Sequence, residues 1–111
     1  MDKQVIKTYG NAEIEAHALK VGGKRNLREV EIETEDNEVF VYLIRRPSRS
    51  VLMAITDAEK KGNVNSMQNV LMGCVLEGDK EAYENDGSIY LKLLSSVGSL
   101  VKSSSETIKK L

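Results

Sequence analysis

The first half of the chain carries two hydrophobic patterns that are typical of β-strands. From Leu27 to Thr34, apolar and acidic residues alternate, which places Val30 and Ile32 on one face and glutamates on the other. A period of two predicts a half-buried strand. From Val39 to Ile44, the residues form a continuous β-branched and aromatic run, typical of a strand covered on both faces. The turn-forming residues 35–38 between the two segments predict a β-hairpin.

The segment before this hairpin has a less regular pattern. Asp2–Tyr9 places its apolar residues on one side and predicts a short helix that ends at Gly10. Residues 12–18 alternate small or apolar residues with glutamate and histidine, which favours a strand, although alanine, glutamate and leucine are good helix formers. The pair Gly22 and Gly23 then predicts a loop.

After Pro47, the only proline, the hydrophobic period changes to that of a helix. A first helix is predicted to begin at Ser48 or Ser50, either of which could cap it, and to end at Gly62. Its apolar stripe contains Val51, Leu52, Ile55 and Ala58.

Two more helices are predicted further along the chain. One covers about Asn65–Leu76, and the other begins after a cap at Asp86 and continues to Val101. Ser103 and Glu106 have the spacing of a capping box, which predicts that the last helix breaks and restarts there.

The order of these elements predicts one α+β domain over residues 1–111. An N-terminal β-hairpin or small antiparallel sheet is followed by a helical C-terminal half of about three helices. Hydrophobic residues make up 41% of the 111 residues and aromatic residues 5%, so a core of this size is mainly aliphatic. The formal net charge is −1, without the basic excess that a nucleic-acid-binding protein usually shows.

Cysteine usage and hydropathy bear on the cellular compartment. Cys74 is the only cysteine, so the chain cannot form an intramolecular disulfide. It contains no apolar run as long as a membrane span or the core of a signal peptide. These features predict a protein of the reducing cytoplasm that has no membrane partner.

The residues that could carry chemistry lack the partners that a reaction needs. His17 is the only histidine, no nucleophile motif accompanies it, and the alternation around it predicts a position on a strand surface. Cys74 lies on an apolar stripe without nearby positive charge, which predicts a buried, unreactive thiol. The acidic residues after Gly78 lack the spacing of a calcium-binding loop, which predicts a solvated inter-helix loop. We therefore expect no catalytic site, no metal site and no cofactor.

Five residues are candidates for contact with a partner. Arg45, Arg46 and Arg49 surround the proline at a predicted helix start, where arginines and free amides could hold a phosphate. The alternative is that these arginines pair with acidic residues of the hairpin or the loop. Met53 and Met72 fall outside the main stripes and are candidates for an exposed surface that accepts varied apolar partners. The alternative for both methionines is packing in the core.

Several segments of the last two-thirds of the chain carry a resemblance to a known family. They are Tyr42–Arg49 (Tyr-Leu-Ile-Arg-Arg-Pro-Ser-Arg), 65–71 (Asn-Ser-Met-Gln-Asn-Val-Leu), 73–81, which contains a Glu-Gly-Asp turn, and the lysine-rich 106–111. On these motifs the chain resembles the small tail assembly chaperones of tailed bacteriophages and prophages, from about Val39 to Leu111. Members often have an aromatic residue in the middle helix, where this chain has Cys-Val-Leu at 74–76.

The resemblance implies a function. Such chaperones coat the long, apolar and helical tape measure protein until the tail tube polymerises around it. It implies the tape measure protein or another tail protein as the partner, in the cytoplasm of a bacterial host. The apolar helical stripes would also serve self-association into a homo-oligomer. Two alternatives remain: a minor structural protein of the phage tail, and a small regulatory module that binds nucleic acid through the three arginines.

Overall fold

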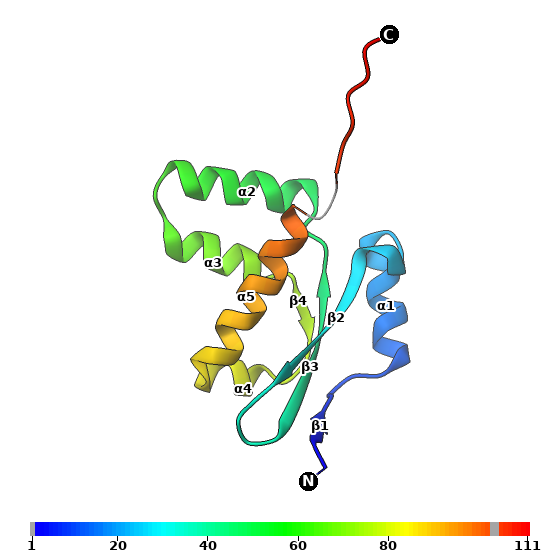
Figure 1. The fold of residues 1–111 in the computed structure, drawn as a ribbon, viewed down its shortest axis with the longest axis vertical. Coiled ribbons are helices and arrows are strands. Elements are labelled where there is room, and N and C mark those ends of the chain that lie inside the picture. Colours follow the sequence, from blue (N-terminus) through cyan, green and yellow to red (C-terminus); the bar gives the residue numbers. More distant parts are fainter. Residues whose placement is uncertain (1, 103–104) are drawn as a thin grey trace.

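In the computed structural model, which describes residues 2–102 and 105–111, a four-stranded sheet lies between one helix and a group of four helices (Figure 1). The elements in chain order are β1 (Gln4–Ile6), α1 (Asn11–Val21), the 3₁₀ turn η1 (Lys24–Asn26), β2 (Leu27–Glu33), β3 (Glu38–Arg45), α2 (Arg49–Lys60), α3 (Val64–Met72), β4 (Val75–Glu77), α4 (Lys80–Asn85) and α5 (Gly87–Val101). The predicted α+β class is confirmed. Three of the four strands precede Pro47, while β4 lies among the later helices, of which the described residues form four where about three were predicted.

Strand β3 is the centre of the sheet. It pairs antiparallel with β2 from Leu27 opposite Arg45 to Glu33 opposite Val39. On the other edge, the first part of β3 pairs with β1 in parallel and the last part pairs with β4 in antiparallel. The predicted hairpin is confirmed, and Asn37 takes the left-handed conformation of its turn, with φ 64°. Strand β3 therefore forms backbone hydrogen bonds with each of the other three strands.

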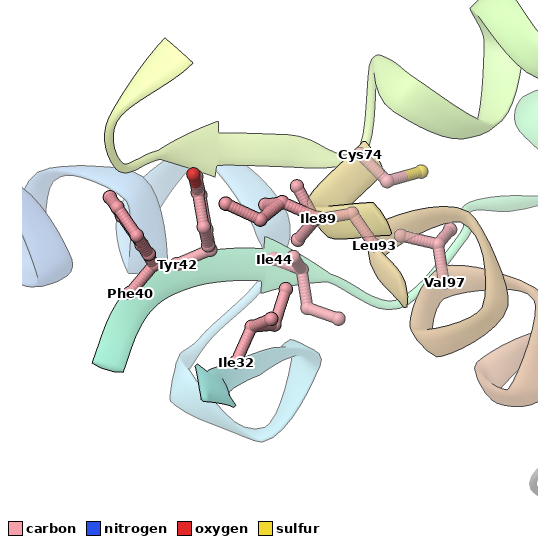
Figure 2. Close-up of a cluster of buried hydrophobic side chains, with 8 residues drawn as sticks. All are labelled: Ile32, Phe40, Tyr42, Ile44, Cys74, Ile89, Leu93 and Val97. Atoms are coloured by element: carbon pink, nitrogen blue, oxygen red, sulfur yellow. The ribbon is translucent and has the colours of Figure 1, made fainter. Parts of the chain in front are cut away.

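The side chains of β3 point alternately into two separate cores. Phe40, Tyr42 and Ile44 pack against α5 in the larger cluster, which is drawn in Figure 2 and also contains Ile32, Cys74, Ile89, Leu93 and Val97. Val41 and Leu43 point to the opposite face and pack with residues of α1 and its flanks: Tyr9, Ala18, Val21 and Leu27. The continuous apolar run thus belongs to a strand that is covered on both faces, as its pattern predicts.

Tyr42 fixes the chain that leaves β4. Its side chain is fully buried, and its hydroxyl donates a hydrogen bond of 2.7 Å to the carbonyl oxygen of Asp79. Burial raises the pKa of Tyr42 to about 12, since the phenolate would be out of water. Gly78 lies against the tyrosine ring with φ 133°, and a Cβ atom there would come within 2.1 Å of the ring. Glycine is therefore required at this position by both the backbone and the packing.

The first 26 residues differ from the expectation. Asp2–Tyr9 is not a helix, since Gln4–Ile6 forms β1 on the free edge of β3. Residues 12–18 are not a strand but belong to α1, which ends at Gly22 in the left-handed conformation. Good helix formers and a glycine cap outweigh the alternation, because α1 buries only a narrow stripe, centred on Ala18 and Val21. With so few buried residues, the sequence of α1 shows little of the 3.6-residue period by which a helix is predicted.

The helix after Pro47 is confirmed, and the prediction for the next segment is wrong in one respect. The hydroxyl of Ser48 accepts a hydrogen bond from the Val51 amide and caps α2. The second helix, predicted to run to about residue 76, ends at Met72, and Val75–Glu77 forms β4 instead. Residues 75–77 extend because the unpaired edge of β3 offers backbone hydrogen-bond partners there.

The acidic segment after β4 is more ordered than the expected loop. Asp79 accepts a hydrogen bond from the Ala82 amide and caps α4, a short helix. Asp86 caps α5 through the Ser88 amide, as predicted. Ser103 of the predicted capping box lies outside the described residues, and residues 105–111 form no helix or strand. Among the helices that the structure describes, none combines the length and apolar composition of a membrane span.

We expect Leu93→Ala to lower the free energy of unfolding by about 2–5 kcal/mol, because a buried leucine leaves a cavity when truncated. Leu93 is 0% exposed at the centre of α5. Leu91, two residues earlier on the same helix, is 63% exposed and supplies the matched control. Leu91→Ala should change stability by less than about 0.5 kcal/mol. Urea melts of both variants check this. Equal losses of unfolding free energy in the two variants would show that Leu93 is not in the core.

Candidate protein-binding surface

An open groove lies where α3, α4 and α5 meet. Its volume is about 500 Å³, and it is lined by Asn69, Met72, Tyr83, Glu84, Gly87 and Tyr90. Met72 ends α3, Tyr83 lies in α4, and Tyr90 lies in the first turns of α5, so three successive helices contribute. The apolar side chains are the large, adaptable kinds that are enriched at protein interfaces.

The floor of this groove is continuous with the larger core. The ring of Tyr83 lies 6.0 Å from the ring of Tyr42 and 6.4 Å from that of Tyr90, both in tilted arrangements. Met72 and Tyr83 also pack against the buried cluster below them. Aromatic pairs with this geometry attract each other and restrict the motion of the rings. The floor of the groove is therefore an extension of the buried core.

One carboxylate, that of Glu84, lines the groove. Of the other acidic residues in 80–86, Glu81 lines a separate depression with Ile6, Glu38 and Phe40, and Asp86 caps α5. Hydrogen bonds from Ser88 lower the pKa of Asp86, which keeps this helix cap ionised. The Lys80 amine is 3.8 Å from a Glu84 carboxylate oxygen across one exposed helix turn. Such a pair contributes little, so Glu84 remains available to another cation.

A second exposed apolar area lies on α2. Leu52 and Met53 form a shallow depression of about 390 Å³ together with Thr56, Asp57 and Lys60. Met53 is 62% exposed, so of the two readings that the sequence left open for it, surface or core, the structure has the surface. Met72 is only half-buried and faces the groove, and the two depressions share no lining residue. The structure therefore assigns the two candidate methionines to different surfaces.

The three candidate arginines have unequal positions. Arg45 is the last residue of β3, and its amide donates a hydrogen bond to the Cys74 carbonyl oxygen. Its Nε donates to the Arg46 carbonyl oxygen at 3.2 Å, and the Arg46 amide donates to the carbonyl oxygen of Asn26. Arg49 is exposed in the first turn of α2. The backbones of Arg45 and Arg46 thus hold the end of β3 to neighbouring segments.

Polar side chains attach α1 and the segment before it to the sheet. His17, predicted on a strand surface, lies half-buried on α1 with Nε2 at 2.8 Å from a Glu77 carboxylate oxygen. The Tyr9 hydroxyl donates to Glu29 at 2.6 Å, and the Lys7 amine lies 3.1 Å from the same carboxylate. These two hydrogen bonds lower the pKa of Glu29. Within residues 2–102 and 105–111, no three histidine, cysteine or acidic side chains come together as metal ligands.

Sequence reasoning missed the groove because it missed α4. Tyr83 lies in a segment that was predicted to be a loop because it is rich in acidic residues. No helix was therefore expected to present Tyr83. The available signal is Asp79, which stands three residues before Ala82 in the position of an N-cap. With that helix in place, Tyr83 projects between the predicted helices.

Comparison with known proteins adds a fold. No family model matches the chain, and no curated protein matches it. Among solved structures, the chain is similar to the uncharacterised protein rbstp2171 from Bacillus stearothermophilus, with a TM-score of 0.52 and 21% sequence identity. The similarity covers 86% of this chain and 98% of that one. At this identity, the likeness shows a shared fold alone.

We expect the Cys74 thiol to react slowly with a thiol reagent in the native protein and rapidly in denaturant. Cys74 is buried in the turn after α3, and burial raises the pKa of its thiol, so little thiolate is present or accessible. Met53→Cys in a Cys74→Ala background is the control, since residue 53 is exposed and should react quickly in the native state. Equal native rates for the two cysteines would contradict a buried Cys74.

Proposed function

We propose that this chain is a tail assembly chaperone of a tailed bacteriophage or prophage, which binds the apolar helical tape measure protein in the host cytoplasm during tail assembly. One observation carries the proposal. The part of the chain that resembles these chaperones forms the helices that hold the open groove and the exposed face of α2. Binding of another protein is thus the activity that this surface supports best.

The chemistry of the groove suits an apolar helical client. Methionine and tyrosine present large apolar area, and the flexible methionine adapts to side chains of different shape. An amphipathic helix docks on such a surface through residues three and four positions apart. A groove of about 500 Å³ has room for a few side chains of a client helix, whose own diameter with side chains is about 10–12 Å. A long client would therefore need several copies of this chain.

The nucleic-acid alternative has less support from the arginines. Arg45 is half-buried in β3 and directs its Nε to a backbone carbonyl, which leaves Arg49 as the exposed member of the three at the start of α2. Phosphate contacts by one exposed arginine would give weak, strongly salt-dependent binding. A structural role in the finished tail would use the same apolar surfaces, and it differs from the chaperone role in that the chain would be found in purified virions.

We expect co-expression with the tape measure protein of the same phage or prophage to keep that client soluble and to co-purify it. Met53→Lys with Met72→Lys should reduce the recovered client by about tenfold or more, because it introduces charge into both apolar surfaces. Leu19→Lys is the matched control, since Leu19 is 88% exposed on α1, on the other side of the sheet, and should leave binding normal.

Each outcome has a separate meaning. If the wild-type chain neither solubilises nor co-purifies the tape measure protein, the chaperone proposal is wrong. If wild-type and double variant bind alike while both remain folded by circular dichroism, the client uses another surface. Met53→Lys alone tests α2 without touching the core, because its side chain is exposed.

A further inference from the structure

All the arginines of the chain lie at one end of the sheet. The sequence places them in two separate segments, and the strand register brings these segments together, because Leu27 of β2 lies opposite Arg45 of β3. The Arg46 amide also donates a hydrogen bond of 2.8 Å to the Asn26 carbonyl oxygen. In Figure 1 this is the place where β2 begins and β3 leads into α2. This arginine end consists of Arg25, Arg28, Arg45, Arg46 and Arg49.

The arginine end is the basic part of an otherwise acidic chain. Lys20 and Lys24 lie close to the arginines in sequence, and residues 20–28 and 45–50 contain no acidic residue. These two segments hold seven of the 16 lysines and arginines, which leaves nine in the rest of the chain against all 17 acidic residues. The net charge of −1 is therefore the balance of a positive end and a negative remainder, and such a separation of charge directs the approach of charged partners.

Four of the five arginine side chains form no ion pair within the part of the chain that the structure describes. Arg25, Arg28 and Arg49 are exposed, Arg45 is half-buried, and the ion pairs of the described residues include none of these four. Arg28 donates instead to the carbonyl oxygens of Arg25 and Leu27, at 2.8 and 2.7 Å. Because backbone carbonyls are neutral, these hydrogen bonds position a guanidinium and leave its positive charge available to a partner.

The choice of arginine indicates the group that this end binds. A guanidinium is a planar fork that binds a carboxylate or a phosphate through two parallel hydrogen bonds, which a lysine amine does not provide. Single-stranded nucleic acid is usually held by aromatic side chains among the cations, and residues 20–28 and 45–50 contain no aromatic residue. A duplex needs a longer basic stripe, whereas here β2 continues with Glu29, Glu31 and Glu33. A short segment rich in carboxylates therefore fits this end better than a nucleic acid does.

We propose that the arginine end docks a short carboxylate-rich segment of another protein. In the described part of the chain, neither the groove between α3, α4 and α5 nor the depression on α2 has an arginine in its lining. The acidic segment and an apolar client thus occupy different surfaces. Docking of the acidic segment does not require the proposed chaperone function, because the two partners differ in chemistry.

Paired substitutions of exposed residues separate the arginine end from the total charge. Arg25→Gln with Arg49→Gln removes two charges from that end, while Arg25→Lys with Arg49→Lys keeps the charges and removes the planar forks. Lys60→Gln with Lys92→Gln is the matched control, since it removes the same charge from exposed residues at the far end of α2 and within α5. Circular dichroism checks that each variant is folded.

Fluorescence anisotropy with a labelled poly-L-glutamate peptide measures the binding. The wild-type chain and the Lys60 and Lys92 control should bind the peptide with nearly equal affinity, which should fall as salt is added. The glutamine pair at the arginine end should weaken binding by about fivefold or more, and the lysine pair there by a smaller factor. Single-stranded oligodeoxythymidine with the same number of negative charges should bind less tightly than the peptide.

Several results would overturn the proposal. A wild-type chain that does not bind the peptide would do so, and so would equal affinity of the wild type and either arginine variant. Equal weakening by the two glutamine pairs would mean that net charge alone drives the binding. Tighter binding of oligodeoxythymidine, lost in the arginine variants, would assign this end to nucleic acid. The tape measure protein is absent from the test, so none of these outcomes bears on the proposed function.

Discussion

The fold depends on covering both faces of β3. Residues 40–44 are all buried, and their side chains alternate between two cores. Each fully buried side chain of this size contributes about 1.5–3 kcal/mol, which is lost if its face is open to water. The fold therefore requires both α1 and α5, since each covers one face of β3. The backbone groups along both edges of β3 also need hydrogen-bond partners. Strand β2 supplies them on one edge, and β1 and β4 supply them on the other.

The same strand positions the groove. Tyr42 holds the Asp79 carbonyl and leaves room for glycine alone at residue 78, so the chain must turn at that point and begin α4. Tyr83 then lies between the rings of Tyr42 and Tyr90. A line of three tyrosines thus runs from the centre of the molecule to its surface, and the floor of the groove is an extension of the core.

Much of the fold could be predicted wherever local pattern and burial agree. The β2–β3 hairpin, α2 and the Asp86 cap of α5 were accessible because each is encoded by residues near in sequence. In α1, the alternation of small and acidic residues imitates a strand, since only a narrow stripe is buried. The three residues of β4 are extended because they pair with β3, which is distant in sequence. Their local pattern therefore could not predict a strand.

The sequence left the position of the two candidate methionines open between an exposed surface and the core. Met53 is 62% exposed, in agreement with its place outside the apolar stripe of α2. Met72 lies at the end of α3, and its surroundings depend on α4, which the acidic residues concealed. A groove formed by three helices is a property of their packing. The pattern of any one of them could not have revealed it.

Under the proposed function, the helices on the α5 side of the sheet form the client-binding face, and α1 closes the sheet. Hydrogen exchange of the chain with and without the proposed client, the tape measure protein, tests this most directly. We expect the client to slow exchange of backbone amides across residues 83–90, which line the groove, and to leave α1 unchanged. Slower exchange in α1 with none at the groove would contradict the account.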